Sequence, residues 1–172
     1  EDDGSWFNSA DGIDFFKVAE QSGLIASIAM SPHHQPELRK VAERHPDLDI
    51  LCHHMSGLRA HGDDARANLK VVTESSKLPN IFLKLSGFHY LTNTEWNFPY
   101  SDTQWVYKEC YEAFSTNMCW GSDFPVVKKS MTHLQSIEAF RTHCDFISEP
   151  DKKAIMGGTL NSLLDKTRSV NK

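Results

Sequence analysis

Apolar positions along the chain fall into short continuous runs that alternate with longer amphipathic stretches. Four of these runs have the length and composition of strands that are buried on both faces of a sheet. They cover residues 24–30, 48–52, 81–86 and 117–120. Because a stretch with helical spacing follows each run, the sequence predicts four successive βα units that form a parallel sheet covered by helices.

The amphipathic stretches begin and end at recognisable helix signals. Gly23 and Pro46 end the first two helices, and Thr132 and Ser148 are suitable N-cap residues for later ones. The predicted helices cover residues 11–22, 36–45, 63–76 and 102–114, a segment that begins at 132, and 148–165 with a break at 157–158.

Two α/β architectures accommodate four βα units. A doubly wound sheet would be complete at 172 residues. A (β/α)₈ TIM barrel needs about 250 residues, so the chain would supply roughly half of one. The first strand is followed by the residues MSPHH (30–34) instead of a glycine-rich phosphate loop, which counts against a dinucleotide-binding fold.

Composition limits the partners and the compartment. The net charge of −5, without a run of lysines or arginines, argues against a surface for nucleic acid or anionic membranes. No segment approaches the roughly 18 apolar residues of a membrane span. The four cysteines form no CxxC pair, so we expect reduced core thiols and a cytoplasmic location. The chain starts at Glu1 without a methionine, which favours a fragment of a longer protein.

The residues that follow the fourth apolar run are the first candidates for chemistry. Gly121 and Ser122 let the backbone turn after the strand, and Pro125 cannot continue a hydrogen-bonded ladder. Asp123 therefore lies at the carboxyl-terminal tip of a buried strand, the position that faces the cleft in α/β enzymes. An N-capping or loop-bracing role for Asp123 is the alternative that this stretch leaves open.

Polar side chains also follow the second and third strands. His53 and His54 close the second strand, and Ser86 closes the third with His89 just beyond it. Imidazoles and a carboxylate at one rim suit proton transfer, or a divalent metal that polarises a carbonyl. Because adjacent residues of a strand point to opposite faces, at most one of the two adjacent histidines should reach a given site. His54 is the better candidate, since it is nearer the tip.

Four segments carry a resemblance to a known family. They are residues 46–57 (PDLDILCHHMSG), 80–87 (NIFLKLSG), 120–125 (WGSDFP) and 155–164 (IMGGTLNSLL). In this order they resemble motifs of the amidohydrolase-related (amidohydrolase 2) TIM-barrel metal-dependent hydrolases, the family of 2-pyrone-4,6-dicarboxylate lactonase and L-fuconolactone hydrolase. The resemblance implies that residues 1–172 are the C-terminal half of such a domain.

The resemblance also implies roles for the strand-end residues. Asp123 matches the general base that activates water or, in metal-using relatives, a metal ligand. His54 matches the histidine that binds the substrate carbonyl, and would be a second ligand if a metal is present. Ser86, His89 and His53 fall at substrate-binding positions. The implied reaction is hydrolysis of a lactone or a similar small carbonyl compound, with zinc, another divalent metal or no cofactor all open.

The departures from the family leave other functions open. His53 replaces the aspartate of the motif, and the His-x-His of the family's first strand does not occur in this chain. A four-stranded half-barrel would have two open edges and an uncovered interior, so we expect a homo-oligomer or a missing N-terminal half as partner. A non-catalytic half-barrel for interaction or dimerisation is one alternative, and a metal-dependent decarboxylase is another. We expect hydrolase activity only when the full barrel is present.

Overall fold

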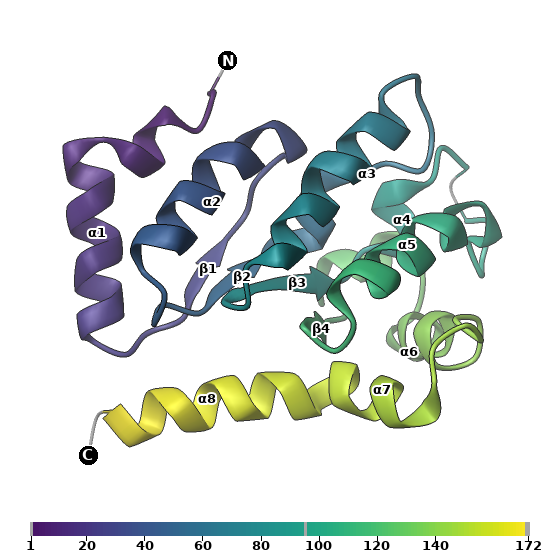
Figure 1. The fold of residues 1–172 in the computed structure, drawn as a ribbon. Helices are drawn as coiled ribbons and strands as arrows, with labels where there is room; N and C mark the ends of the chain where they lie inside the picture. Colours follow the sequence, from purple (N-terminus) through teal and green to yellow (C-terminus); the bar gives the residue numbers. More distant parts are fainter. Residues whose placement is uncertain (1, 95, 171–172) are drawn as a thin grey trace.

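The computed structural model describes residues 2–94 and 96–170 and contains one parallel sheet with helices around it (Figure 1). The strands are β1 (Ala26–Ile28), β2 (Ile50–Cys52), β3 (Ile81–Leu85) and β4 (Met118–Trp120). They lie in the order β1-β2-β3-β4, and each neighbouring pair is parallel. Short, right-handed crossovers between consecutive strands predict that the strands lie in sequence order, and the sheet confirms this. The regular strands are shorter than the apolar runs, because the ends of the runs are irregular.

The helices follow the predicted alternation. They are α1 (Ala10–Gln21), α2 (Gln35–Arg44), α3 (Ala65–Thr73), α4 (Phe88–Leu91), α5 (Gln104–Phe114), α6 (His133–Arg141), α7 (Glu149–Lys153) and α8 (Thr159–Val170). Thr132 caps α6 as predicted, through a capping box with Gln135. The side chain of Asp102 caps no helix; it instead accepts hydrogen bonds from Thr92 and His61.

One face of the sheet packs against α2, α3 and α5, which form a layer above the strands in Figure 1. The core between them contains many aliphatic and sulfur-containing side chains that are almost fully buried, together with Tyr107 and Phe114 of α5. These include Leu38, Val41, Leu69, Val72, Val106 and Cys110 from the helices and Ile50, Cys52, Leu83 and Leu85 from the strands. Burial of this apolar surface is the main driving force for the fold. All four cysteines are buried free thiols.

The other face of the sheet is covered in part by α8, which runs beneath the strands in Figure 1. Leu160 and Leu163 of α8 pack against Leu51, Phe82 and Cys119. Near the amino-terminal end of β2, the Lys166 ammonium binds both carboxylate oxygens of Asp49 at 3.0 and 2.8 Å. The sequence predicted an uncovered interior here. The prediction was wrong in part, because the apolar side of α8 packs against this face of the sheet and covers some of it.

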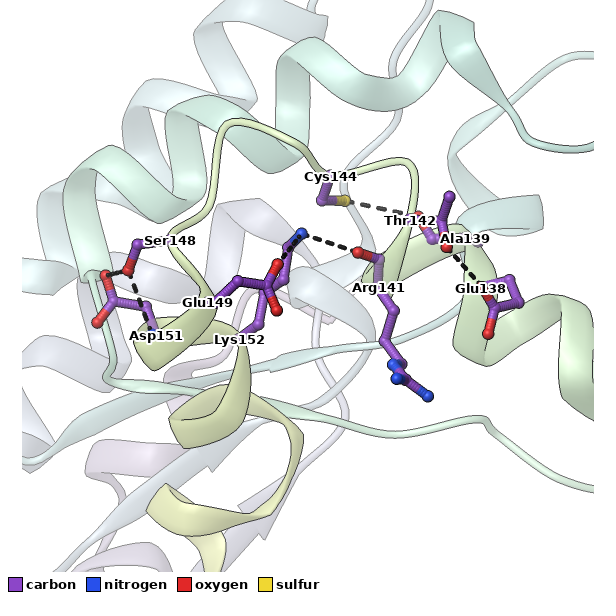
Figure 2. Close-up of polar contacts among 9 residues, drawn as sticks. All are labelled: Glu138, Ala139, Arg141, Thr142, Cys144, Ser148, Glu149, Asp151 and Lys152. Atoms are coloured by element: carbon purple, nitrogen blue, oxygen red, sulfur yellow. Dashed lines mark hydrogen bonds and ion pairs between the residues drawn. The ribbon is translucent and has the colours of Figure 1, made fainter.

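The connection from α6 to α8 is held by a buried lysine. The Lys152 ammonium donates to the Arg141 carbonyl at 2.8 Å and to Glu149 at 3.0 Å. Figure 2 draws both contacts as dashed lines. Ser148 caps α7 by accepting from the Asp151 amide. Because Lys152 is only 8% exposed, its charge requires these partners. They fix α7 and therefore the direction in which α8 leaves it.

Apolar side chains remain exposed beside the edge strand β1. Phe15, Val18 and Leu24 are 53%, 59% and 50% exposed and line an open cavity of about 690 Å³. The spacing of apolar residues along α1 predicts that Phe15, Phe16, Val18 and Ala19 share one side of the helix, but of these four only Phe16 and Ala19 are buried. Patches of this kind usually mark a contact surface. Within the described residues, no helix has the length and apolar character needed to cross a membrane.

Candidate active site

The carboxyl-terminal ends of β2, β3 and β4 bring three predicted site residues together. His54 follows β2, Ser86 follows β3 and Asp123 follows β4. The Nδ1 atom of His54 lies 2.9 Å from the Ser86 hydroxyl, and its Nε2 atom lies 3.8 Å from Asp123 Oδ1. The His54 ring therefore lies between a hydroxyl and a carboxylate, each of which comes from a different strand end.

The backbone at these strand ends has an unusual conformation. His54, Met55 and Ser56 have φ values of 47°, 52° and 57°, and Asp123 has a φ of 58°. Residues other than glycine seldom adopt this left-handed region, and each such residue costs on the order of 1 kcal/mol or more. Buried Met55 and Ser56 anchor the first turn. The strain is typical of sites where a side chain has to be held in one orientation.

Tyr90 is a member of this cluster that the sequence prediction missed. Its hydroxyl donates to Asp123 Oδ2 at 2.5 Å, and its ring meets the His54 ring edge-on with centroids 5.3 Å apart. Burial, together with the Asp123 carboxylate, raises the pKa of Tyr90 to about 12, so the phenol stays protonated. The only signal in the sequence was an aromatic residue next to His89 in the loop after the third strand.

His89 lies beside the cluster but makes no hydrogen bond within it. Its ring packs on Tyr90 with centroids 4.1 Å apart. Both ring nitrogens are buried without a hydrogen-bond partner among the described residues. Burial lowers the pKa of His89, so the neutral ring is favoured.

His53 also stays at the rim, on the side of β1. Its Nε2 atom lies 2.5 Å from the Ser27 hydroxyl, and its ring centroid lies 5.6 Å from that of His54. The expectation that at most one of the two histidines reaches a given site rested on the assumption that both belong to the strand. That assumption was wrong, because β2 ends at Cys52 and the chain turns at once.

Lys84 of β3 supplies a positive charge that the sequence analysis did not select. It packs against Gly121, where an added Cβ would lie 2.8 Å from its Cε atom. Burial, with the nearby Lys84 ammonium, lowers the pKa of His53. For His54, burial and Lys84 together outweigh the opposing effect of Asp123, so its pKa is lowered too. Both imidazoles are therefore mainly neutral near pH 7.

The strand-end cluster contains side chains of the types that bind divalent metal ions. His54 and Asp123 are two suitable donors, and they converge within 3.8 Å. Within the described part of the chain, no group of three or more histidine, cysteine or acidic side chains could hold a metal. A catalytic zinc site usually takes three protein ligands. The donors among the described residues therefore do not make up such a site.

The sequence and the fold were compared with those of known proteins. A family model described as Amidohydrolase matches residues 2–159. No curated protein matches the sequence. An amidohydrolase from Burkholderia multivorans, crystallised in one form with HEPES and in another with zinc, superposes with a TM-score of 0.83 at 19% identity. The superposition with the HEPES form covers 95% of this chain and 61% of that chain.

A second solved structure has a similar likeness. A probable 2-pyrone-4,6-dicarboxylic acid hydrolase from Acinetobacter baumannii, with citric acid bound, gives a TM-score of 0.77 at 19% identity. The match covers 92% of this chain and 59% of that chain. The chain thus spans about three-fifths of the length of these proteins. At this identity the likeness establishes a shared α/β fold with a parallel sheet.

Proposed function

The chain belongs to the amidohydrolase family, and on this premise we propose that its strand-end cluster is part of a hydrolase site that adds water to a lactone. The observation that carries the proposal is the 3.8 Å approach of His54 Nε2 to Asp123 Oδ1. A proton acceptor and a neutral proton donor then lie side by side at the rim where parallel α/β sheets bind substrates.

In the proposed reaction, Asp123 acts as the general base. Its carboxylate takes a proton from a water molecule, whose oxygen attacks the lactone carbonyl carbon. The carbonyl π electrons move to the oxygen, which the Nε2–H of His54 stabilises as it becomes negative. The ring C–O bond then breaks, and the proton held by Asp123 passes to the leaving alkoxide. One lactone and one water give one hydroxy acid.

The neighbours of His54 support this division of roles. When the Ser86 hydroxyl donates to Nδ1, the single ring proton of a neutral imidazole resides on Nε2. Ser86 is only 1% exposed, so this hydrogen bond is shielded from water. The lowered pKa of His54 keeps the ring neutral, which suits a hydrogen-bond donor that must not retain an extra proton.

We also propose that residues 1–172 are the second half of a (β/α)₈ barrel. Support comes from the parallel four-stranded sheet, from the barrel-type amidohydrolases that it resembles, and from the 61% share of their length that it spans. The remaining strand ends of the site, and further ligands if a metal takes part, would come from a preceding half or from a second copy of the chain. Zinc in the Burkholderia protein makes a divalent metal the natural candidate there.

A reconstitution experiment tests the proposal. The chain is mixed with a fragment that contains the first four βα units of an amidohydrolase barrel, and hydrolysis of a pyrone dicarboxylate and of a sugar lactone is followed. We expect turnover in the mixture that depends on Asp123. Turnover that survives Asp123→Asn in a correctly folded mixture would exclude the proposed base.

A non-catalytic interaction module is the second candidate. It is favoured by the exposed Phe15, Val18 and Leu24 beside β1, which offer an apolar contact surface without any chemistry. In this case the reconstituted protein would associate through that surface and show no hydrolysis, whatever residue stands at position 123.

A further inference from the structure

The Tyr90 side chain occupies the centre of the strand-end cluster. Its hydroxyl donates to Asp123 Oδ2 at 2.5 Å. Its ring lies 4.1 Å from the His89 ring in a tilted stack and 5.3 Å from the edge-on His54 ring, measured between centroids. Three side chains from three strand ends thus surround one flat ring that carries one hydrogen-bond donor.

The backbone of Tyr90 is fixed, so this arrangement depends on the rotation of one side chain. The Tyr90 amide donates to the Gly87 carbonyl at 2.7 Å, and the Arg59 guanidinium donates to the Tyr90 carbonyl. Gly87 permits the close approach of the ring, because a Cβ at that position would lie 2.1 Å from Tyr90 Cδ2. Rotation of the side chain about its first torsion would remove the ring from Asp123 without moving the loop.

The occupied cluster leaves polar groups unsatisfied. Both nitrogens of His89 are buried without a partner among the described residues while the Tyr90 ring packs on it. A buried imidazole without hydrogen bonds is unfavourable. A bound molecule that replaced the Tyr90 ring and offered polar atoms to His89 would remove this cost. A ring that also carries a polar group within reach of His89 would therefore be better satisfied here than the Tyr90 side chain, which offers His89 none.

We propose that Tyr90 is an internal ligand of this site, and that His54, His89 and Asp123 form a receptor for a flat ring that bears a hydroxyl donor. An external ligand of this class binds by displacing the Tyr90 side chain. The inference concerns the same cluster as the proposed hydrolysis, and it deepens that proposal by naming the shape of the ligand. It is tested by binding alone, so its failure and the failure of the hydrolase proposal are distinguishable.

The test removes the internal ligand and offers it back as a free molecule. Tyr90→Ala leaves a ring-sized void, and p-cresol is the tyrosine side chain cut at its Cα–Cβ bond. Binding of p-cresol and of toluene, which has the same ring and methyl group without the hydroxyl, is measured by NMR titration of the whole chain. Engineered apolar voids of this size bind small aromatic molecules.

We expect p-cresol to bind Tyr90→Ala about tenfold to a hundredfold more tightly than toluene, the range for a hydrogen bond to a charged group. In Tyr90→Ala with Asp123→Asn, this preference should fall toward the weaker range of an uncharged bond. Wild type should bind p-cresol at the cluster more weakly than Tyr90→Ala, because the ligand must first displace the Tyr90 side chain from Asp123.

Three results would overturn the inference. The first is toluene binding to Tyr90→Ala as tightly as p-cresol, and the second is no binding of either compound. The third is equal binding of p-cresol to wild type and variant, which would place the bound p-cresol elsewhere. If the alanine variant loses its near-ultraviolet circular dichroism, Tyr90→Phe provides the second measurement. The carboxyl ¹³C resonance of Asp123 must then shift between wild type and Tyr90→Phe. An unchanged resonance would show that the Tyr90 hydroxyl does not hydrogen-bond to the Asp123 carboxylate.

Discussion

His54 and Asp123 face each other across 3.8 Å although they follow β2 and β4, which are separated by β3. The residue at the end of the intervening strand, Ser86, holds the other nitrogen of the same imidazole. The short strands and tight turns bring the three strand ends toward one point. Changes at any of the three positions should therefore affect one shared arrangement.

Replacing Asp123 by asparagine keeps the shape of the side chain and removes its negative charge. In a reconstituted, active protein we expect kcat to fall by roughly 10²–10⁴-fold, the range for a positioned general base. KM should change little, since the carboxylate acts mainly on water. The exposed Asp145 provides a matched control, and Asp145→Asn should leave kcat unchanged. Full activity per folded Asp123→Asn molecule would reduce Asp123 to a structural residue.

Replacing His54 by asparagine should act on the carbonyl oxygen instead. The expected loss in kcat is roughly 10²–10³-fold, as for the removal of one donor to a developing oxyanion. Ser86→Ala removes the partner that orients the ring and should cause a smaller loss in the same direction. Kinetic measurements on both variants check this order. A Ser86→Ala variant that loses more activity than His54→Asn would contradict the assigned roles.

Lys84→Met should make the strand-end histidines more basic. The Lys84 ammonium contributes to the lowered pKa of both His53 and His54. A histidine with a lowered pKa in the folded state binds fewer protons than in the unfolded chain, so it contributes stability above about pH 6.5 that is lost as the pH falls. Removing Lys84 should raise both pKa values and weaken this acid destabilisation. NMR titration of the histidines and melting curves from pH 5 to 8 provide the check.

Removing the main contact of α8 should destabilise the protein. Leu163 is 4% exposed and packs on Leu51, Phe82 and Cys119. Leu163→Ala should lower the free energy of unfolding by about 2–3 kcal/mol, in the lower part of the range for buried leucines. Leu164, which is 39% exposed, is the neighbouring control, and its replacement by alanine should cost much less. Equal effects of the two changes in denaturant unfolding would mean that α8 does not pack on the sheet.

The isolated chain should associate in solution. Phe15, Val18 and Leu24 expose apolar surface beside an edge strand, and both features favour self-association. Sedimentation analysis should show oligomers that Phe15→Ser with Val18→Ser weakens. Leu134 on α6 is 66% exposed and offers a control, since Leu134→Ser should leave the distribution unchanged. A compact monomer with cooperative unfolding would argue against the expectation.

The sequence predicted those features that local patterns encode. Apolar runs separated by helical stretches gave the strands and their order, and Thr132 and Ser148 marked helix starts correctly. The family resemblance and the amidohydrolase match agree on the parent family. His54 and Asp123 were selected because strand ends of a parallel sheet meet at one edge.

The features that the sequence did not predict depend on contacts between distant segments. Tyr90 reaches Asp123 across 33 positions of sequence, and nothing in the loop distinguishes it from other aromatic residues. The position of α8 depends on which of two apolar sheet faces is free, which periodicity alone does not reveal. The exposure of Phe15 and Val18 likewise depends on what lies beside β1. In each case the pattern of one segment is compatible with several partners.

Because α8 packs beneath the sheet, one face of the sheet is covered, while the carboxyl-terminal ends of the strands are not covered by this helix. The strand-end cluster lies at the carboxyl-terminal ends of β2, β3 and β4, whereas α8 covers Leu51, Phe82 and Cys119 on one face of the sheet. A second copy that completed the sheet would have to fit around the volume that α8 already fills. Assembly through the edge strands, with α8 left in place, is therefore the geometry in which the strand ends of two copies can form one site.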